Sequence, residues 1–151
     1  MQQRFDFTSV AADGYKAMLG VHSYVQKSGL DLGLLELVKI RVSQINGCAF
    51  CLAMHIPLGR KHGLSDDQLN LLVAWREAPV YSDQERAALA WAESMTHLTN
   101  GNVSDDAYEQ ACSQFSTREI ADLSFAVAEI NAWNRLMVCS QTPPQVSAAK
   151  L

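Results

Sequence analysis

Apolar residues recur every three or four positions along almost the whole chain, which is the pattern of a helix with one buried face. The clearest example lies in the last third of the chain, where one helix face would carry Ile120, Leu123, Val127, Ile130 and Trp133. No stretch of the sequence shows the strict alternation of apolar and polar residues that is typical of a half-buried strand. The periodicity therefore predicts an all-α fold.

Capping signals divide this pattern into about seven helices. Residues 65–68 (SDDQ) and 82–85 (SDQE) each place a serine three positions before Gln or Glu, which is the signature of a capping box at a helix start. The second and third helices, joined by a short Asn-Gly turn, are expected to form an antiparallel hairpin around which the bundle is built. The expected helices are a first ending at Gly29, a second from Asp31 to Ile45, a third ending at Gly63, a fourth from Ser65 toward Trp75, a fifth from Ser82 to about Leu98, a sixth from Ser104 through Phe115 and a long seventh from Ser116.

The length and the short connections predict one domain over residues 1–151, because a chain of this size can bury a single core without disulfide staples. Pro143 and Pro144 cannot continue a helix, so the tail from about residue 143 is expected to be loose. Large apolar and aromatic residues on all the helices exceed what one small bundle covers, which favours a homo-oligomer.

The charge and the chain's apolar runs exclude some classes of protein. A formal net charge of -4 disfavours binding to nucleic acid. The first ten residues, MQQRFDFTSV, lack the features of a secretory signal, and no apolar run reaches the ~20 residues needed to span a bilayer. We therefore expect a cytoplasmic protein without a membrane or nucleic-acid partner. Thiols are kept reduced there, so the four cysteines are expected to be free, catalytic or metal-bound.

Cysteines occur both in a pair and singly. Cys112 and Cys139 have no partner at short spacing and stand among apolar neighbours, so we interpret both as small buried core residues. Cys48 and Cys51, three positions apart, form a CxxC pair within INGCAFCLAMH, residues 45–55. The pair is the candidate for chemistry.

The CxxC pair lies at the expected start of the third helix. There, unpaired backbone N–H groups and the positive end of the helix dipole favour a thiolate at Cys48. Cys51 lies one turn further on and His55 another turn on, so the three side chains share one helix face. Such a dithiol can reduce a peroxide: thiolate attack yields a sulfenic acid, which the second thiol resolves as a disulfide with loss of water.

Glu36 is a carboxylate in the middle of a helix that is apolar nearly all round, so it needs a buried partner. In the expected hairpin it lies ten residues before the turn and His55 lies eight residues after it, or roughly 15 and 12 Å along the two axes. The spacing allows Glu36 to hold one ring nitrogen of His55 while the other faces Cys51. This is the arrangement of nucleophile, base and orienting group found in activated-nucleophile sites.

Other interpretations of the same residues remain open. The two cysteines and His55 could be core residues, and Glu36 could pair with Lys39 or an arginine as part of the structure. Alternatively, the two cysteines and His55, with Glu36 or His62, could bind zinc in a structural or regulatory module. Zinc is disfavoured because closed sites usually bring ligand pairs together from separate segments. His22 and His97 are interpreted as structural or surface residues.

Glu36, Cys48 twelve positions later, Cys51 and His55 together resemble the motif of the alkylhydroperoxidase D-like, carboxymuconolactone decarboxylase family. The stretches VAWREAP, RAALAWAE and INAWNRL are also similar to that family, so the resemblance covers about residues 15–136. It implies an all-helical fold assembled as a trimer or hexamer, with peroxidase or thiol–disulfide activity. It also implies a relay in which Glu36 and His55 activate Cys51 while Cys48 resolves, whereas the helix-start argument favours Cys48 as the more acidic thiol.

Two departures from the family pattern occur, at Phe50 and at Pro57, which is expected to bend the third helix just past His55. Some members carry a histidine just before the second cysteine, where this chain has Phe50, so one polar contact is missing. The true decarboxylases lack the cysteine pair, so its presence here argues against lactone decarboxylation. We therefore expect a dithiol antioxidant oxidoreductase that reduces a peroxide, needs no cofactor or bound metal, and is re-reduced by a partner dithiol protein.

Overall fold

The structure, a computed structural model, describes residues 2–98 and 101–146, and all regular elements within those ranges are helical. This confirms the all-α prediction. The helices run Phe7–Val10 (α1), Ala12–Gln26 (α2), Leu32–Asn46 (α3), Ala49–Lys61 (α4), Asp66–Leu71 (α5), Asp83–Thr96 (α6), Asp105–Cys112 (α7) and Thr117–Ser140 (α8), with a 3-10 turn, η1, at Leu72–Ala74.

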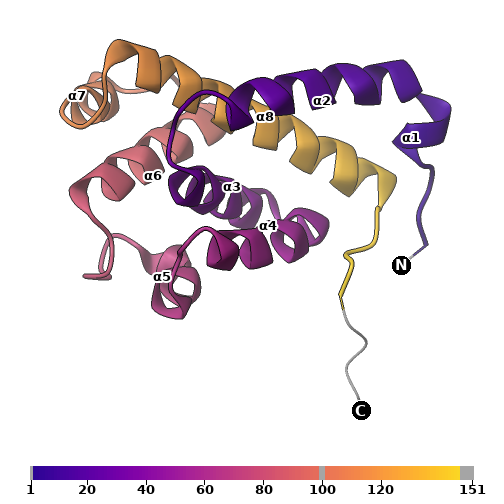
Figure 1. Cartoon of the computed structure of the whole chain (residues 1–151), viewed down its shortest axis with the longest axis horizontal. Coiled ribbons are helices and arrows are strands. Elements are labelled where there is room, and N and C mark those ends of the chain that lie inside the picture. The colour runs from indigo at the N-terminus through magenta and orange to yellow at the C-terminus, as the bar shows by residue number, and fades with distance from the viewer. Residues whose placement is uncertain (1, 99–100, 147–151) are drawn as a thin grey trace.

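Helix α3 is the centre of the fold, because residues 33–40 are all buried. It packs against α4, α6 and α8. In Figure 1, α3 and α4 lie in the middle of the molecule, with α2 and α8 on one side and α5 on the other. One apolar cluster joins α3 to α8 and includes Leu35, Val38, Val42, Leu123, Val127 and Ile130. A second lies on the other side of α3 and includes Leu37, Ile40, Leu69, Leu72, Trp75 and Leu89.

Side-chain caps fix the helix starts where the sequence predicts them. Ser65, Ser82 and Ser116 each form a complete capping box at the start of α5, α6 and α8. Asp31 caps α3 by accepting a 2.9 Å hydrogen bond from the backbone N–H of Leu34. The predicted boundaries hold to within a few residues, except that the expected fourth helix changes to 3-10 geometry at η1.

Buried charges join α6 to the centre of the bundle. Glu93 accepts hydrogen bonds from Arg41 Nε at 2.7 Å, Trp75 Nε1 at 2.9 Å and Arg76 Nη1 at 2.5 Å. Burial alone would raise the pKa of Glu93, but these three donors outweigh it and lower the pKa below its ordinary value. The VAWREAP and RAALAWAE stretches supply three of these residues, Trp75, Arg76 and Glu93, and therefore help to hold the helices together.

One element of the fold lies beyond the predictions. The single-turn helix α1, capped by Asp6, was not expected, because one turn is too short to show an apolar period. Residues 142–146 carry no regular element, while the rest of the predicted loose tail, residues 147–151, lies outside the described residues. No helix within the described ranges is long and apolar enough to cross a membrane. Assembly as a trimer or hexamer stays a prediction.

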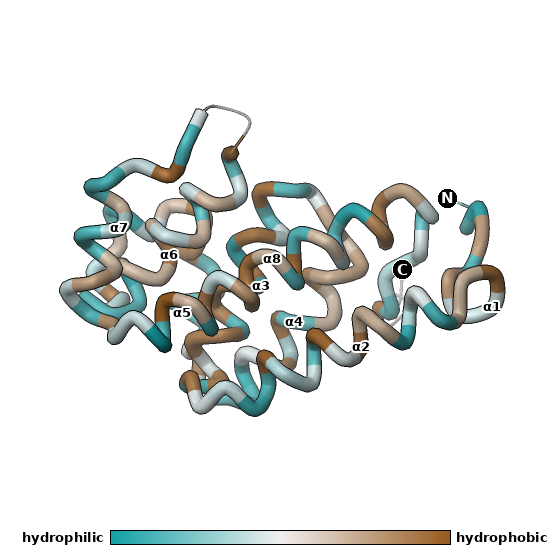
Figure 2. The backbone as a smooth tube through the Cα atoms, turned by 90° about the horizontal axis from the view of Figure 1, so that it is seen from above, coloured by the Kyte–Doolittle hydropathy of each residue, from teal (hydrophilic) through white to brown (hydrophobic). Residues whose placement is uncertain are grey.

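The prediction that Cys112 and Cys139 are buried is wrong, because both are exposed. On α7 the buried face is formed by Ala107 and Ala111, and the next residue, Cys112, lies about 100° further round the helix. Cys139 likewise lies between the buried Met137 and Ser140 on α8. Figure 2 shows hydrophilic and hydrophobic residues interspersed along peripheral helices such as α2 and α7, so an apolar neighbour in sequence does not indicate burial.

Candidate active site

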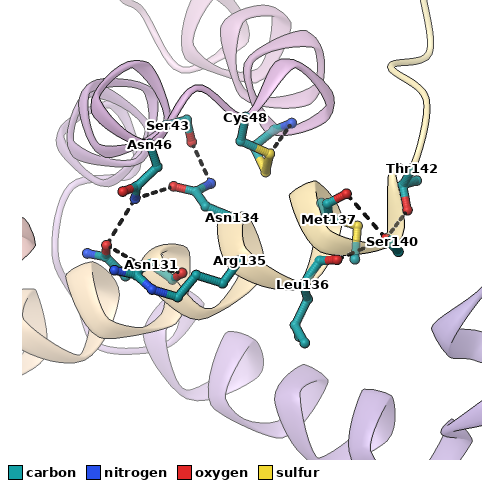
Figure 3. The surroundings of a disulfide bond; sticks show 11 residues. Ser43, Asn46, Cys48, Asn131, Asn134, Arg135, Leu136, Met137, Ser140 and Thr142 are labelled. Atoms are coloured by element: carbon teal, nitrogen blue, oxygen red, sulfur yellow. Dashed lines mark hydrogen bonds between the residues drawn. A yellow bond between two sulfur atoms is a disulfide. The ribbon is translucent and has the colours of Figure 1, made fainter. Parts of the chain in front are cut away.

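The turn between α3 and α4 sets the position of the CxxC pair. Gly47 ends α3 with a backbone φ of 67°, a left-handed conformation that glycine adopts without steric cost. Asn46, just before it, donates from Nδ2 to Asn131 Oδ1 and Asn134 Oδ1 of α8, both at 2.9 Å. Asn134 in turn donates to Ser43 Oγ at 3.0 Å, as Figure 3 shows. The sequence interpretation missed this network, although INAWNRL places its two asparagines one helical turn apart.

Cys48 and Cys51 are joined by a disulfide, and both are almost fully buried. Cys48 is the N-cap residue of α4, as the sequence predicts, and its Sγ accepts a 3.3 Å hydrogen bond from the backbone N–H of Cys51. The structure therefore shows the oxidised form of the pair. The helix-end environment that would favour a thiolate at Cys48 after reduction is also present.

Glu36 and His55 meet across the α3–α4 hairpin. Glu36 Oε2 lies 2.7 Å from His55 Nδ1, and each residue is only 4% exposed. An ionised Glu36 accepts the Nδ1–H, which leaves Nε2 as the free ring nitrogen. His55 lies one turn along α4 from Cys51. The hairpin thus brings Glu36, Cys48, Cys51 and His55 into one region, and their catalytic roles stay a prediction.

A pocket of about 380 Å³ lies between α2, α4 and α8. Cys51 lines this pocket, whereas Cys48 is not among the described residues that do. Its histidine and carboxylate lining consists of His22, Glu36, His55, His62 and Glu129. Its apolar walls are formed by Tyr15, Leu19, Phe50, Met54, Leu58, Trp133 and Met137. The pocket gives a small substrate space beside one cysteine of the pair.

A second histidine–carboxylate pair lines the same pocket. His22 Nδ1 of α2 lies 2.7 Å from Glu129 Oε1 of α8, so the interpretation of His22 as only a structural or surface residue missed its place in the pocket. The other oxygen of Glu129 lies 3.5 Å from Nζ of Lys39, which is fully buried. Burial alone would raise the pKa of Glu129, but the His22 hydrogen bond and the Lys39 charge lower it. His97, at the end of α6, is exposed.

The oxidised pair does not offer the ligand set that a zinc ion needs, since zinc binds thiolates rather than a disulfide. Within the part of the chain that the structure describes, no group of three or more His, Cys, Asp and Glu side chains is arranged to hold a metal ion. Lys39, which the sequence offered as a partner for Glu36, pairs with Glu129 instead.

Comparison with known families shows which family the chain belongs to. The model of the carboxymuconolactone decarboxylase family matches residues 12–94, which include α2, the whole α3–α4 hairpin and most of α6. The chain belongs to the carboxymuconolactone decarboxylase family. The resemblance read from Glu36, the CxxC pair and His55 is thereby confirmed.

Relatives within the carboxymuconolactone decarboxylase family extend the match beyond the hairpin. The uncharacterized protein YdfG of Bacillus subtilis is 36% identical over 138 residues, 91% of this chain and 94% of its own length. A solved structure from Agrobacterium tumefaciens, of unknown function and suggested to be the antioxidant defence protein AhpD, is 39% identical, with a TM-score of 0.94 over 97% of this chain and 100% of its own. The match therefore includes α7 and α8.

The same fold also occurs in a more distant enzyme, a debrominase. The debrominase Bmp8 superposes with a TM-score of 0.78 over 92% of this chain and 74% of its own, at only 16% identity. At that identity the likeness shows the fold alone. Family membership therefore does not define the reaction, which has to be argued from the residues around Cys51.

Proposed function

We propose that the protein reduces a peroxide through a dithiol–disulfide cycle between Cys51 and Cys48, with His55 and Glu36 activating the attacking thiol. The observation that carries this proposal is the disulfide between two buried cysteines, one of which lines a pocket together with the hydrogen-bonded pair of His55 and Glu36. A nucleophile, a base one helical turn away and a carboxylate that orients the base are the parts of an activated-nucleophile site.

The cycle starts from the reduced pair. Nε2 of His55 takes the proton of Cys51, and the resulting thiolate attacks one oxygen of the peroxide R–O–O–H. The sulfur–oxygen bond forms as the O–O bond breaks, giving a sulfenic acid on Cys51 and RO⁻, which is protonated to ROH. The thiol of Cys48 then attacks the sulfenic sulfur, forming the disulfide and releasing water.

A donor protein with a dithiol completes the cycle. Two thiol–disulfide exchanges reduce Cys48 and Cys51 and leave the donor with a disulfide. The net reaction converts one peroxide and one donor dithiol into ROH, water and one donor disulfide. No step draws on a cofactor. The proposal places the reaction in the cytoplasm, where such dithiol donors are kept reduced.

Access to the pocket supports Cys51 as the attacking residue. Cys51 lines the pocket and lies one turn from His55, while Cys48 sits at the helix start. The helix-end argument still favours a thiolate at Cys48, since its Sγ accepts a backbone N–H. We assign the attack to Cys51, because a peroxide must first reach the sulfur, whatever the acidity of the thiol.

Variants of His55 and Glu36 test whether the two act as one unit. Glu36→Gln keeps the shape but removes the negative charge that stabilises an imidazolium, and His55→Phe removes the base. Each is expected to lower kcat/KM for peroxide by about 10²–10⁴-fold, the usual contribution of a general base. Steady-state turnover with a reducing dithiol measures the effect.

The double variant separates a relay from two independent contributions. It is expected to be little worse than the worse single variant, because residues that act as a unit are strongly non-additive. Thermal unfolding checks that each variant folds, and His97→Phe at an exposed histidine outside the pocket is the matched control. Full activity in Glu36→Gln would show that this carboxylate is only a structural partner of His55.

A further inference from the structure

The pocket holds an imidazole that the proposed cycle does not use. His22 extends from α2, its side chain is 41% exposed, and it lines the same pocket as Cys51 and His55. Its Nδ1 is fixed at 2.7 Å by Glu129, which is 3% exposed. Two of the three histidines that line the pocket, His22 and His55, therefore lie on different helices and are each held through Nδ1 by a buried carboxylate.

The buried charge of Lys39 helps to keep Glu129, the partner of His22, ionised. Lys39 is fully buried and its Nζ lies 3.5 Å from Glu129 Oε2, an ion pair without hydrogen-bond geometry. The hydrogen bond from His22 and this positive charge lower the pKa of Glu129 against the opposing effect of burial. An ionised Glu129 accepts the Nδ1–H of His22, which leaves Nε2 as the free nitrogen of a ring that lines the pocket.

The chemistry of O–O cleavage needs a proton away from the attacking sulfur. In a displacement at oxygen, the leaving oxygen departs on the side opposite Sγ, and it leaves as a strongly basic alkoxide or hydroxide. His55 lies on α4, one helical turn from Cys51, whereas His22 comes from α2, a different wall of the pocket. Phe50, immediately before Cys51, adds only an apolar surface.

We propose that His22, positioned by Glu129, is the general acid that protonates the leaving oxygen of the peroxide. This inference rests on the proposed peroxidase function. As Sγ of Cys51 bonds to one oxygen and the O–O bond breaks, the Nε2–H of a doubly protonated His22 transfers to the leaving oxygen. The products are the sulfenic acid of Cys51, neutral ROH and a His22 ring that has lost one proton, which solvent at this half-exposed side chain replaces.

Leaving groups of different basicity test this role. tert-Butyl hydroperoxide releases a strongly basic alkoxide, whereas peracetic acid releases acetate, which needs no proton. His22→Gln is expected to lower the rate of oxidation of the reduced protein by tert-butyl hydroperoxide about 10²-fold or more, and by peracetic acid less than about 3-fold. Stopped-flow measurement of thiol loss in a single turnover gives both rates.

Controls separate an acid from a pocket-shaping residue. His97→Gln, at an exposed histidine outside the pocket, should leave both rates unchanged, and His22→Asn should reproduce the His22→Gln pattern if the first variant folds poorly. An equal fall with both oxidants, or no fall with either, would overturn the role of His22 while leaving the dithiol cycle intact. A wild-type protein that reacts with neither oxidant would instead overturn the proposed function itself, and this inference with it.

Discussion

Replacing Cys51 with serine is expected to abolish peroxide turnover, because the sulfur that forms the sulfenic acid is then absent. Cys48→Ser should also stop turnover, but at a later step: Cys51 still reacts once, and the sulfenic acid has no partner to resolve it. A sulfenic-acid trap followed by mass spectrometry of the two variants distinguishes these outcomes. The trapped adduct is expected on Cys51 in Cys48→Ser.

The exposed cysteines supply the matched controls for these variants. Cys112→Ser and Cys139→Ser remove thiols that lie outside the pocket lining, so both should retain wild-type turnover. A sulfenic acid trapped on Cys48 in the Cys51→Ser protein, with none on Cys51 in Cys48→Ser, would reverse the order of attack. The helix start would then decide which cysteine reacts, rather than access to the pocket.

Glu129→Gln is expected to destabilise the protein by about 3–5 kcal/mol, because it leaves the charge of the fully buried Lys39 without its partner. The double variant Lys39→Met with Glu129→Gln should recover much of this loss, since replacing a whole buried ion pair is often nearly neutral. Urea unfolding of the three proteins measures the free energies. Asp66→Asn breaks the exposed Arg60–Asp66 pair and should cost no more than about 1 kcal/mol.

Glu129 also makes the free energy of unfolding depend on pH. The pKa of Glu129 is lower in the folded protein than its ordinary value of 4.5, so the ionised form stabilises the fold above that pH. This contribution is lost as the pH falls below about 4.5 and through the lowered folded pKa. The difference in unfolding free energy between wild type and Glu129→Gln should shrink over that range. A difference that stays constant down to acidic pH would show that the pKa of Glu129 is not lowered in the folded protein.

The sequence was most informative where structure is local. The capping boxes at Ser65 and Ser82 are set within four residues, so the helix starts could be predicted. Glu36 and His55 lie on two helices joined by one short turn, so the helical rise per residue was enough to predict that they lie at similar depth in the hairpin.

Long-range packing accounts for what the sequence did not reveal. His22 and Glu129 are 107 positions apart and meet only because α2 lies along α8, so no local pattern links them. Exposure of Cys112 depends on which face of α7 meets the core, a choice made by its partners rather than by its own neighbours in sequence. The anchoring of the hairpin turn by Asn131 and Asn134 depends in the same way on the position of α8.

A thiol count on the fully reduced protein, before and after one equivalent of peroxide, tests the dithiol cycle most directly. Peroxide is expected to remove two thiols, and peptide mapping should find a disulfide joining Cys48 to Cys51 while Cys112 and Cys139 stay reduced. Metal analysis of the same reduced sample tests the alternative that the cysteines and His55 bind zinc. Unchanged thiols after peroxide, or stoichiometric zinc that is lost when Cys48 is replaced, would contradict the proposed peroxidase.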